Sequence, residues 1–167
     1  DVENLLETDF VLTNESLTST DPLTGSGQAY VLTIVPGVTG DVRVSLPAAA
    51  ASTPAGTDSL ASNELVFEYD ITAPMLTEVT PVQALGMNPT PSYTFNTDEP
   101  GTISYGGACS SATTIAVLDD NTVTFEALCD GTYSDCTFIE TVDLGNVSSP
   151  LSVSEFTIDT AQAEVTL

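Results

Sequence analysis

The side chains that could do chemistry in this chain are almost all carboxylates. Its 167 residues include 24 Asp and Glu but one basic residue, Arg43, and no His, which gives a formal charge of −23. Without His or Lys, neither a Ser-His-Asp nor a Cys-His arrangement can form, and no Schiff base or Ser-Lys pair is available. Phosphoryl transfer lacks its usual Lys and Gly-rich loop. Only paired-carboxylate chemistry of the glycosidase type remains.

The candidate carboxylate pairs do not favour that chemistry. Asp119 with Asp120, and Asp98 with Glu99, are neighbours in predicted turns, where acidic side chains are typically solvated. Glycosidase carboxyls lie about 5 to 10 Å apart across a sugar, and the chain has no Trp on which a sugar could stack. The sequence therefore predicts that the protein is not an enzyme.

The charge also narrows the choice of partners. A surface with this excess of carboxylates repels phosphate backbones and anionic lipids, which argues against nucleic-acid and membrane-surface roles, and it attracts divalent cations. No apolar run approaches the roughly 20 residues needed to span a bilayer. We therefore expect neither nucleic-acid binding nor direct membrane insertion.

The elements that position these side chains are predicted to be strands. Hydrophobic residues make up 41% of the chain and charged residues 15%, which argues against disorder. Polar and apolar residues alternate over residues 30–35, 41–46 and 121–125, a pattern typical of half-buried strands. Only residues 2–6 offer a short helical period. The fold is predicted to be all-β.

A sequence repeat predicts two domains. Residues 70–76 recur in altered form at 159–165, an offset of 89 residues that matches the usual size of a β-sandwich domain. We expect a partial domain over residues 1–70, a complete one over 71–160, and a C-terminal strand over 161–167. Expected strands lie near residues 9–14, 28–35, 40–47, 61–69, 75–80, 91–97, 102–106, 112–117, 121–126, 133–142 and 150–158.

Short motifs in both halves recur in a known family. The second half carries Thr72-Ala73-Pro74, Asp98-Glu99-Pro100-Gly101-Thr102-Ile103, Asp130-Gly131-Thr132-Tyr133 and Asp143-Leu144-Gly145-Asn146; the first carries Phe10-Val11-Leu12-Thr13-Asn14, Gly25-Ser26-Gly27 and Val42-Arg43-Val44-Ser45-Leu46-Pro47-Ala48. With these motifs the chain resembles bacterial Ig-like repeat domains of extracellular surface proteins, the modules of adhesin stalks and fibres. The resemblance implies tandem Greek-key β-sandwiches, of which the first is incomplete.

The resemblance also implies a disulfide. Members of the family often carry cysteines at the positions of Cys109 and Cys136, so we expect these two to be joined, which is typical of an extracellular or cell-surface protein. Cys129 is then a buried free thiol or an intersubunit bridge. Pairing of Cys129 with Cys136 also stays open from the sequence.

Calcium is the ligand that the acidic residues fit best. In an Ig-like sandwich the loop after the second strand, the loop before the last strand and the N-terminal linker meet at one end. This would gather hard oxygen ligands of the kind that Ca²⁺ takes: Asp70, Asp98, Glu99, Asp143 and Asn146. The alternative is that Asp98 and Asp143 are turn residues bonded to nearby backbone amides.

The two ends of the chain suggest assembly. The first unit lacks opening strands, while Ala163-Glu164-Val165-Thr166-Leu167 begins a strand with no domain after it. A neighbour's strand could close the open sandwich, giving a head-to-tail homopolymer, or contacts between neighbouring repeats of a longer chain. The alternative is that the ends record where a processed or excised piece was cut.

The sequence thus predicts an extracellular structural protein, a subunit of a surface filament or stalk. The alternative function is a binding module, either a ligand-binding adhesin or a carbohydrate-binding accessory domain. A binding module would expose an aromatic cluster or a concave polar site, whereas a stalk or fibre would concentrate its contacts at the two ends. The aromatic residues that distinguish the two are Tyr93, Tyr105, Phe125 and Tyr133.

Overall fold

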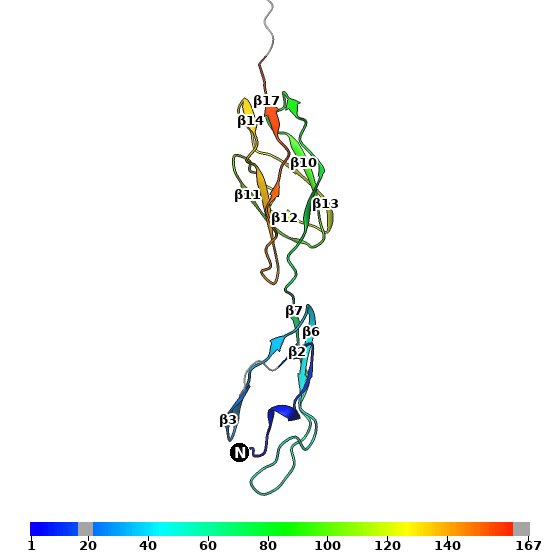
Figure 1. Cartoon of the computed structure of the whole chain (residues 1–167), viewed down its shortest axis with the longest axis vertical. Coiled ribbons are helices and arrows are strands. Elements are labelled where there is room, and N and C mark those ends of the chain that lie inside the picture. The colour runs from blue at the N-terminus through cyan, green and yellow to red at the C-terminus, as the bar shows by residue number, and fades with distance from the viewer. Residues whose placement is uncertain (17–21, 162–167) are drawn as a thin grey trace, which may run out of the picture. The chain divides into compact units, whose positions relative to one another are not determined.

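The chain folds into two compact β-rich units. The structure, a computed structural model, describes residues 1–16 and 22–161. One unit comprises Asp1–Ile71 and the other Thr72–Leu167, so the division falls beside the repeat seam at residue 70. Figure 1 traces the first unit from blue to cyan and the second from green to red. We describe each unit by itself.

The first unit is built from three small antiparallel sheets. Its main sheet has the order β1-β6-β7, and the pairs β2-β5 and β3-β4 form two-stranded ribbons. A single 3₁₀ turn, η1 (Glu7–Asp9), precedes the first strand. The strands are β1 (Val11–Thr13), β2 (Glu15–Ser16), β3 (Leu23–Ser26), β4 (Ala29–Leu32), β5 (Val35–Pro36), β6 (Gly40–Ser45) and β7 (Leu65–Tyr69).

The first unit differs from the sequence pattern at two places. The short helical period of residues 2–6 gives no helix, and the backbones of Val2 and Glu3 bridge to Gly27 and Ser52. The sequence does not predict strand β3, which contains Gly25 with φ 112°. A Cβ there would collide with the carbonyl oxygen of Ala29 across the hairpin, so only glycine fits.

The second unit has longer strands and a closed core. Its sheets have the orders β13-β10-β8, β12-β11-β15-β16 and β14-β17-β9, with β9 and β17 parallel and the other pairs antiparallel. The strands are β8 (Leu76–Thr80), β9 (Leu85–Gly86), β10 (Ser92–Thr97), β11 (Gly101–Gly106), β12 (Ile115–Ala116), β13 (Asp119–Thr124), β14 (Gly131–Tyr133), β15 (Thr137–Val142), β16 (Leu151–Ser152) and β17 (Phe156–Ile158).

Aromatic rings from several strands fill this core. Alternate residues of β10, including Tyr93 and Phe95, are buried together with Phe138 of β15. The Phe138 ring lies 5.1 Å from that of Tyr93 and 5.3 Å from that of Phe95. Strands of two separate sheets thus contribute to one hydrophobic cluster, which also contains Val123 and Ile103.

The predicted fold class is confirmed at the level of all-β structure. Small, mainly antiparallel sheets that share a buried core are consistent with a β-sandwich. The Ig-like Greek-key topology stays an expectation from the resemblance. Among the described residues, no helix is long and apolar enough to cross a membrane.

Candidate assembly surface and candidate ligand sites

One face of the β1-β6-β7 sheet in the first unit is apolar. The strand registers align Leu12, Val44 and Leu65 across the three strands, and Val42 with Phe67. Residues paired across antiparallel strands share a face, and residues two apart along a strand do too. These five side chains therefore form one surface, which we call the apolar face.

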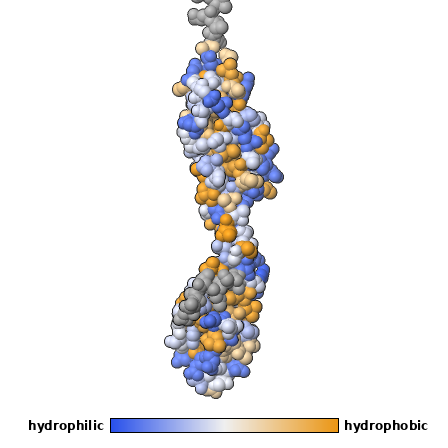
Figure 2. Space-filling view, in the orientation of Figure 1, coloured by the Kyte–Doolittle hydropathy of each residue, from blue (hydrophilic) through white to orange (hydrophobic). Residues whose placement is uncertain are grey.

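The apolar face is only partly covered. Val42 at its centre is fully buried, whereas Leu65 is 57% and Phe67 38% exposed. Val42, Ala51 and Pro22 are the only buried apolar residues among the described residues of this unit, while the second unit buries a large aromatic cluster. Figure 2 shows hydrophobic residues at the surface. The first unit therefore lacks a closed hydrophobic core within its described part.

The opposite face of the same sheet is more polar. Arg43 donates hydrogen bonds to Glu64 at 2.8 Å and to Asp41 at 2.9 Å. Hydrogen bonding to Glu64 and then to Asp41 raises the pKa of the Arg43 guanidinium. Val66, which is paired with Arg43, lies on this face and is 43% exposed. The two faces of β7 thus differ in chemistry.

Strand β7 also forms an edge of its sheet. It pairs with β6 on one side, and within the described part of the chain no strand pairs with its other side. Its sequence, Leu-Val-Phe-Glu-Tyr, is rich in residues that favour strands. An apolar edge strand with unpaired N–H and C=O groups is a template for pairing with a further strand. The edge and the apolar face adjoin each other on β7.

The predicted assembly strand cannot be compared with this surface directly. Ala163, Glu164, Val165, Thr166 and Leu167 lie outside the described residues. Of the expected segment 161–167, only Ala161 is described, and its backbone N–H donates to the Asp159 carboxylate at 3.0 Å.

The predicted calcium ligands are distributed over both units. Asp70 belongs to the first unit, where its carboxylate accepts a hydrogen bond from the Thr39 hydroxyl at 2.8 Å. In the second unit Asp98 accepts one from the Met75 backbone N–H at 2.7 Å, the turn role named above as the alternative. The turns holding Glu99 and Asp143 leave neighbouring strand ends, because Gly101 pairs with Val142.

The described residues contain no compact cluster of acidic side chains. In the part of the chain that is described, no three His, Cys, Asp or Glu side chains gather closely enough to hold a metal ion. The backbone carbonyl of Asn146 accepts a hydrogen bond from Val142 N–H at 3.0 Å and so helps to close the turn after β15. Calcium binding stays a prediction.

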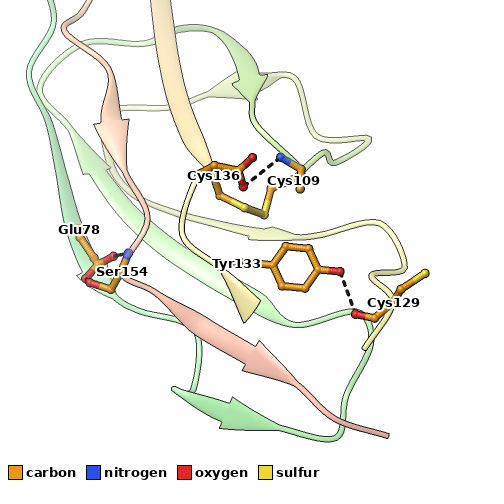
Figure 3. Close-up of a disulfide and its surroundings, with 8 residues drawn as sticks. Glu78, Cys109, Cys129, Tyr133, Cys136 and Ser154 are labelled. Carbon is orange, nitrogen blue, oxygen red and sulfur yellow. Dashed lines mark hydrogen bonds between the residues drawn. A yellow bond between two sulfur atoms is a disulfide. The ribbon is translucent and has the colours of Figure 1, made fainter. Parts of the chain in front are cut away.

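The cysteine prediction is confirmed for the disulfide; for Cys129 the buried alternative is wrong, and the intersubunit bridge stays a prediction. Cys109 and Cys136 are joined, with their Cα atoms 5.2 Å apart, and both are buried (Figure 3). Cys129 is free but exposed, not buried. Its carbonyl oxygen accepts a hydrogen bond from the Tyr133 hydroxyl at 2.8 Å, which leaves the thiol outside the core.

The four aromatic residues named as a test of a binding surface belong to the core. Tyr93 and Phe125 are buried, and Tyr105 and Tyr133 are partly buried against the same cluster. Burial raises the pKa of the Tyr93 hydroxyl, and the nearby Glu78 carboxylate adds to the effect. These side chains therefore form no exposed platform for a ligand.

One polar core residue was not foreseen from the sequence. Glu140 of β15 is completely buried, between Phe138 and Val142 on the inward side of the strand. Glu140 alternates along the strand in step with these two apolar residues, which indicates an inward position. Acidic residues are rarely buried without a partner, so the alternation alone does not predict burial here.

Comparisons of the chain with protein-family models, with curated proteins and with solved structures found no match.

Proposed function

We propose that this chain is a structural module of an extracellular filament or stalk, in which Ig-like modules join head to tail. The joint is made where a β-strand of a neighbouring module pairs with the edge of β7 (Leu65–Tyr69). The observation that carries the proposal is the apolar face of the first unit, which adjoins that open edge.

The free energy for such a joint has two sources. A strand added at β7 would satisfy backbone N–H and C=O groups at the open edge. Its side chains would also cover Leu65 and Phe67, which are 57% and 38% exposed. Burying a large apolar side chain stabilises by about 1.5 to 3 kcal/mol when complete, so covering these two partly exposed residues contributes roughly 0.5 to 1.5 kcal/mol each.

The donor that we propose is the segment 163–167 of a neighbouring copy. Ala163, Val165 and Leu167 alternate with Glu164 and Thr166. As a strand this segment presents three apolar side chains on one side and two polar ones on the other. The apolar side would extend the apolar face, and the polar side would stay in water.

The disulfide supports the compartment that we propose. The Cys109–Cys136 bond joins two buried sulfurs of the core, and disulfides of this structural kind persist in oxidising surroundings. This supports an extracellular or cell-surface location. The core position of Tyr93, Phe125, Tyr105 and Tyr133 gives no support to the alternative of a sugar-binding or adhesive module.

Negative-stain electron microscopy and sedimentation velocity of the purified chain test the proposal. The wild type is expected to form chains or oligomers at high concentration. Leu65→Asp should leave only monomers, because it places a charge on the apolar face. Val66→Asp is the matched control, since it adds the same charge to the same strand on the opposite face, and should still assemble. Circular dichroism checks that both variants stay folded.

Two results would contradict the proposal. One is a wild type that stays monomeric at every concentration reached, even when a synthetic peptide of residues 159–167 is added and fails to bind. The other is equal assembly of Leu65→Asp and Val66→Asp.

Calcium at the end of the second unit is a separate proposal, supported by the neighbouring turns of Asp98 and Asp143. Titration calorimetry with CaCl₂ tests it. Heat that is lost in Asp143→Asn would support a site, and no heat from the wild type would contradict one.

A further inference from the structure

Glu140 is a buried acidic residue in a unit that contains no basic side chain. Its side chain is 0% exposed, and in the register of the sheet it lies opposite Ile103 of β11. Gly101 packs directly against it, because a Cβ at Gly101 would lie 2.9 Å from Oε1 of Glu140. The carboxyl group is therefore shielded from solvent and packed against the backbone of Gly101.

No basic side chain of the second unit can neutralise this carboxyl. Residues 72–167 contain no Lys, Arg or His. The single Arg of the chain, Arg43, pairs with Asp41 and Glu64 in the first unit. A buried carboxylate must be paired with a cation, coordinate a metal or take up a proton, since leaving it charged and unpaired costs many kcal/mol. Of these three ways, only proton uptake requires nothing from outside the chain except water.

The hydrogen bonds around Glu140 are also those of a neutral acid. Its Oε2 lies 2.5 Å from the Thr97 hydroxyl oxygen on β10, and among the described residues its Oε1 has no hydrogen-bond partner. A carboxylate accepts hydrogen bonds at both oxygens, so this environment supplies too few donors for one. A carboxylic acid needs one acceptor for its own proton, and the Thr97 oxygen is in place for that role.

Counting the protons of Thr97 leads to the same state. Its hydroxyl has one proton but two acceptors in reach, Oε2 of Glu140 at 2.5 Å and the Glu99 carbonyl at 3.0 Å. If Glu140 carries a proton on Oε2, it donates to Thr97, and Thr97 donates to the Glu99 carbonyl. Both contacts are then hydrogen bonds, whereas an ionised Glu140 leaves one of them without a proton.

We propose that Glu140 is a protonated carboxylic acid in the folded domain, and that its proton links β15 to β10 across the core. The second unit is thereby stabilised by acid and weakened by base. The link joins strands of two different sheets, because β10 pairs with β8 and β13 while β15 pairs with β11 and β16.

The surrounding groups agree with this assignment. Burial raises the pKa of Glu140, the Thr97 hydrogen bond opposes that rise, and the charges of Asp98 and Glu99 raise the pKa further. These two carboxylates lie in the turn between β10 and β11. The neighbours contributed by the other elements, Thr97, Gly101, Ile103 and Ser148, are uncharged, and the Ser148 hydroxyl accepts the Glu140 backbone N–H at 2.9 Å.

The raised pKa fixes the sign of the pH dependence. A carboxyl that binds its proton more tightly in the folded state contributes stability in full below its unfolded pKa of about 4.3. As the pH rises from there to the folded pKa, the folding equilibrium constant falls by up to tenfold per pH unit, and above the folded pKa the contribution is gone. Glu140 therefore makes the second unit more stable at acidic than at basic pH.

Carbon-13 NMR of the whole chain, labelled at the glutamate side-chain carboxyls, tests the protonation directly. Glu140→Gln assigns the signal by its disappearance. The Glu140 carboxyl is expected to titrate at a higher pH than the remaining glutamate signals. A Glu140 signal that titrates together with them, or one that shifts when a chelator is added, would overturn the proposal.

Denaturant unfolding over a range of pH tests the consequence. Glu140→Gln keeps the shape without a titratable proton and should flatten the decline in stability from acidic to basic pH. Glu155→Gln, which removes one charge at an exposed position of the same unit, should keep that decline. If the two variants have equal pH slopes, Glu140 does not carry the effect and the proposal fails.

Discussion

At the scale of single residues, the Cys109–Cys136 disulfide makes a quantitative prediction. The bond closes a loop over a sequence separation of 27, which in the chain-entropy treatment contributes about 3 to 4 kcal/mol. The double variant Cys109→Ala/Cys136→Ala should lose that much free energy of unfolding, measured by urea denaturation followed by circular dichroism. Addition of a reductant to the wild type should have a similar effect.

Cys129 supplies the control for this measurement. Its thiol is exposed and takes no part in the bond. Cys129→Ser should therefore change the free energy of unfolding by no more than about 0.5 kcal/mol. A loss from Cys129→Ser as large as that from the double variant would contradict the assignment of the disulfide as the stabilising feature.

At this scale the sequence is most informative about reactions that require a particular type of side chain. The lack of His and Lys predicts that the chain has no catalysis that depends on those side chains, and this stays a prediction. The burial of single side chains was harder to predict from the sequence. A core position was one of two alternatives for Cys129, yet its thiol is exposed and its carbonyl oxygen accepts the Tyr133 hydroxyl. The burial of Glu140 was not predicted, because acidic residues are rarely buried without a partner and its partner, Thr97, lies on a strand distant in the sequence.

At the scale of elements, the aromatic core of the second unit is the main source of its stability. Phe138 is completely buried and contacts rings on β10 and β11, with Tyr105 at 5.0 Å and Tyr93 at 5.1 Å between centroids. Phe138→Ala should cost about 3 to 5 kcal/mol, because it removes contacts and leaves a cavity. Urea unfolding measures this loss.

An exposed apolar residue of the same unit gives the matched control. Leu144, in the turn after β15, is 53% exposed. Leu144→Ala should cost less than about 1 kcal/mol, since little packing is lost. Equal losses from Phe138→Ala and Leu144→Ala would show that the cluster is not the core described here.

Strands could be predicted where alternation is long and local. Strands β10 and β15 each have six residues that alternate inward and outward, and both were expected near their observed positions. Strand β3 was missed, because Gly25 favours a turn by composition. The pairings of Val2 with Gly27 and of Glu3 with Ser52 carry no local signal, so the helical period of residues 2–6 was misleading.

At the scale of the whole molecule, the charge of −23 acts against assembly. Two copies repel each other, and salt screens that repulsion, since the Debye length falls from about 30 Å at 0.01 M to about 8 Å at 0.15 M. Because the proposed joint is apolar and backbone-mediated, self-association should strengthen as NaCl rises. Sedimentation equilibrium at the two salt concentrations measures this. Association that weakens with salt would indicate a joint made by ion pairs, against the proposal.

The all-β class and the position of the seam could be predicted from composition and from the repeat at residues 70 and 159. The open apolar face could not, because it depends on how β1, β6 and β7 pair over more than fifty residues of sequence. From that face we infer the central claim, that a strand of a neighbouring copy completes the first unit.

Hydrogen exchange at β7 tests this claim most directly. Amide exchange of Leu65–Tyr69 is measured by NMR or mass spectrometry at low and at high protein concentration, with edge strand β13 of the second unit as an internal reference. Strand pairing between copies predicts that exchange at β7 slows at high concentration while exchange at β13 does not change. Equal exchange at β7 under both conditions would contradict assembly through this edge.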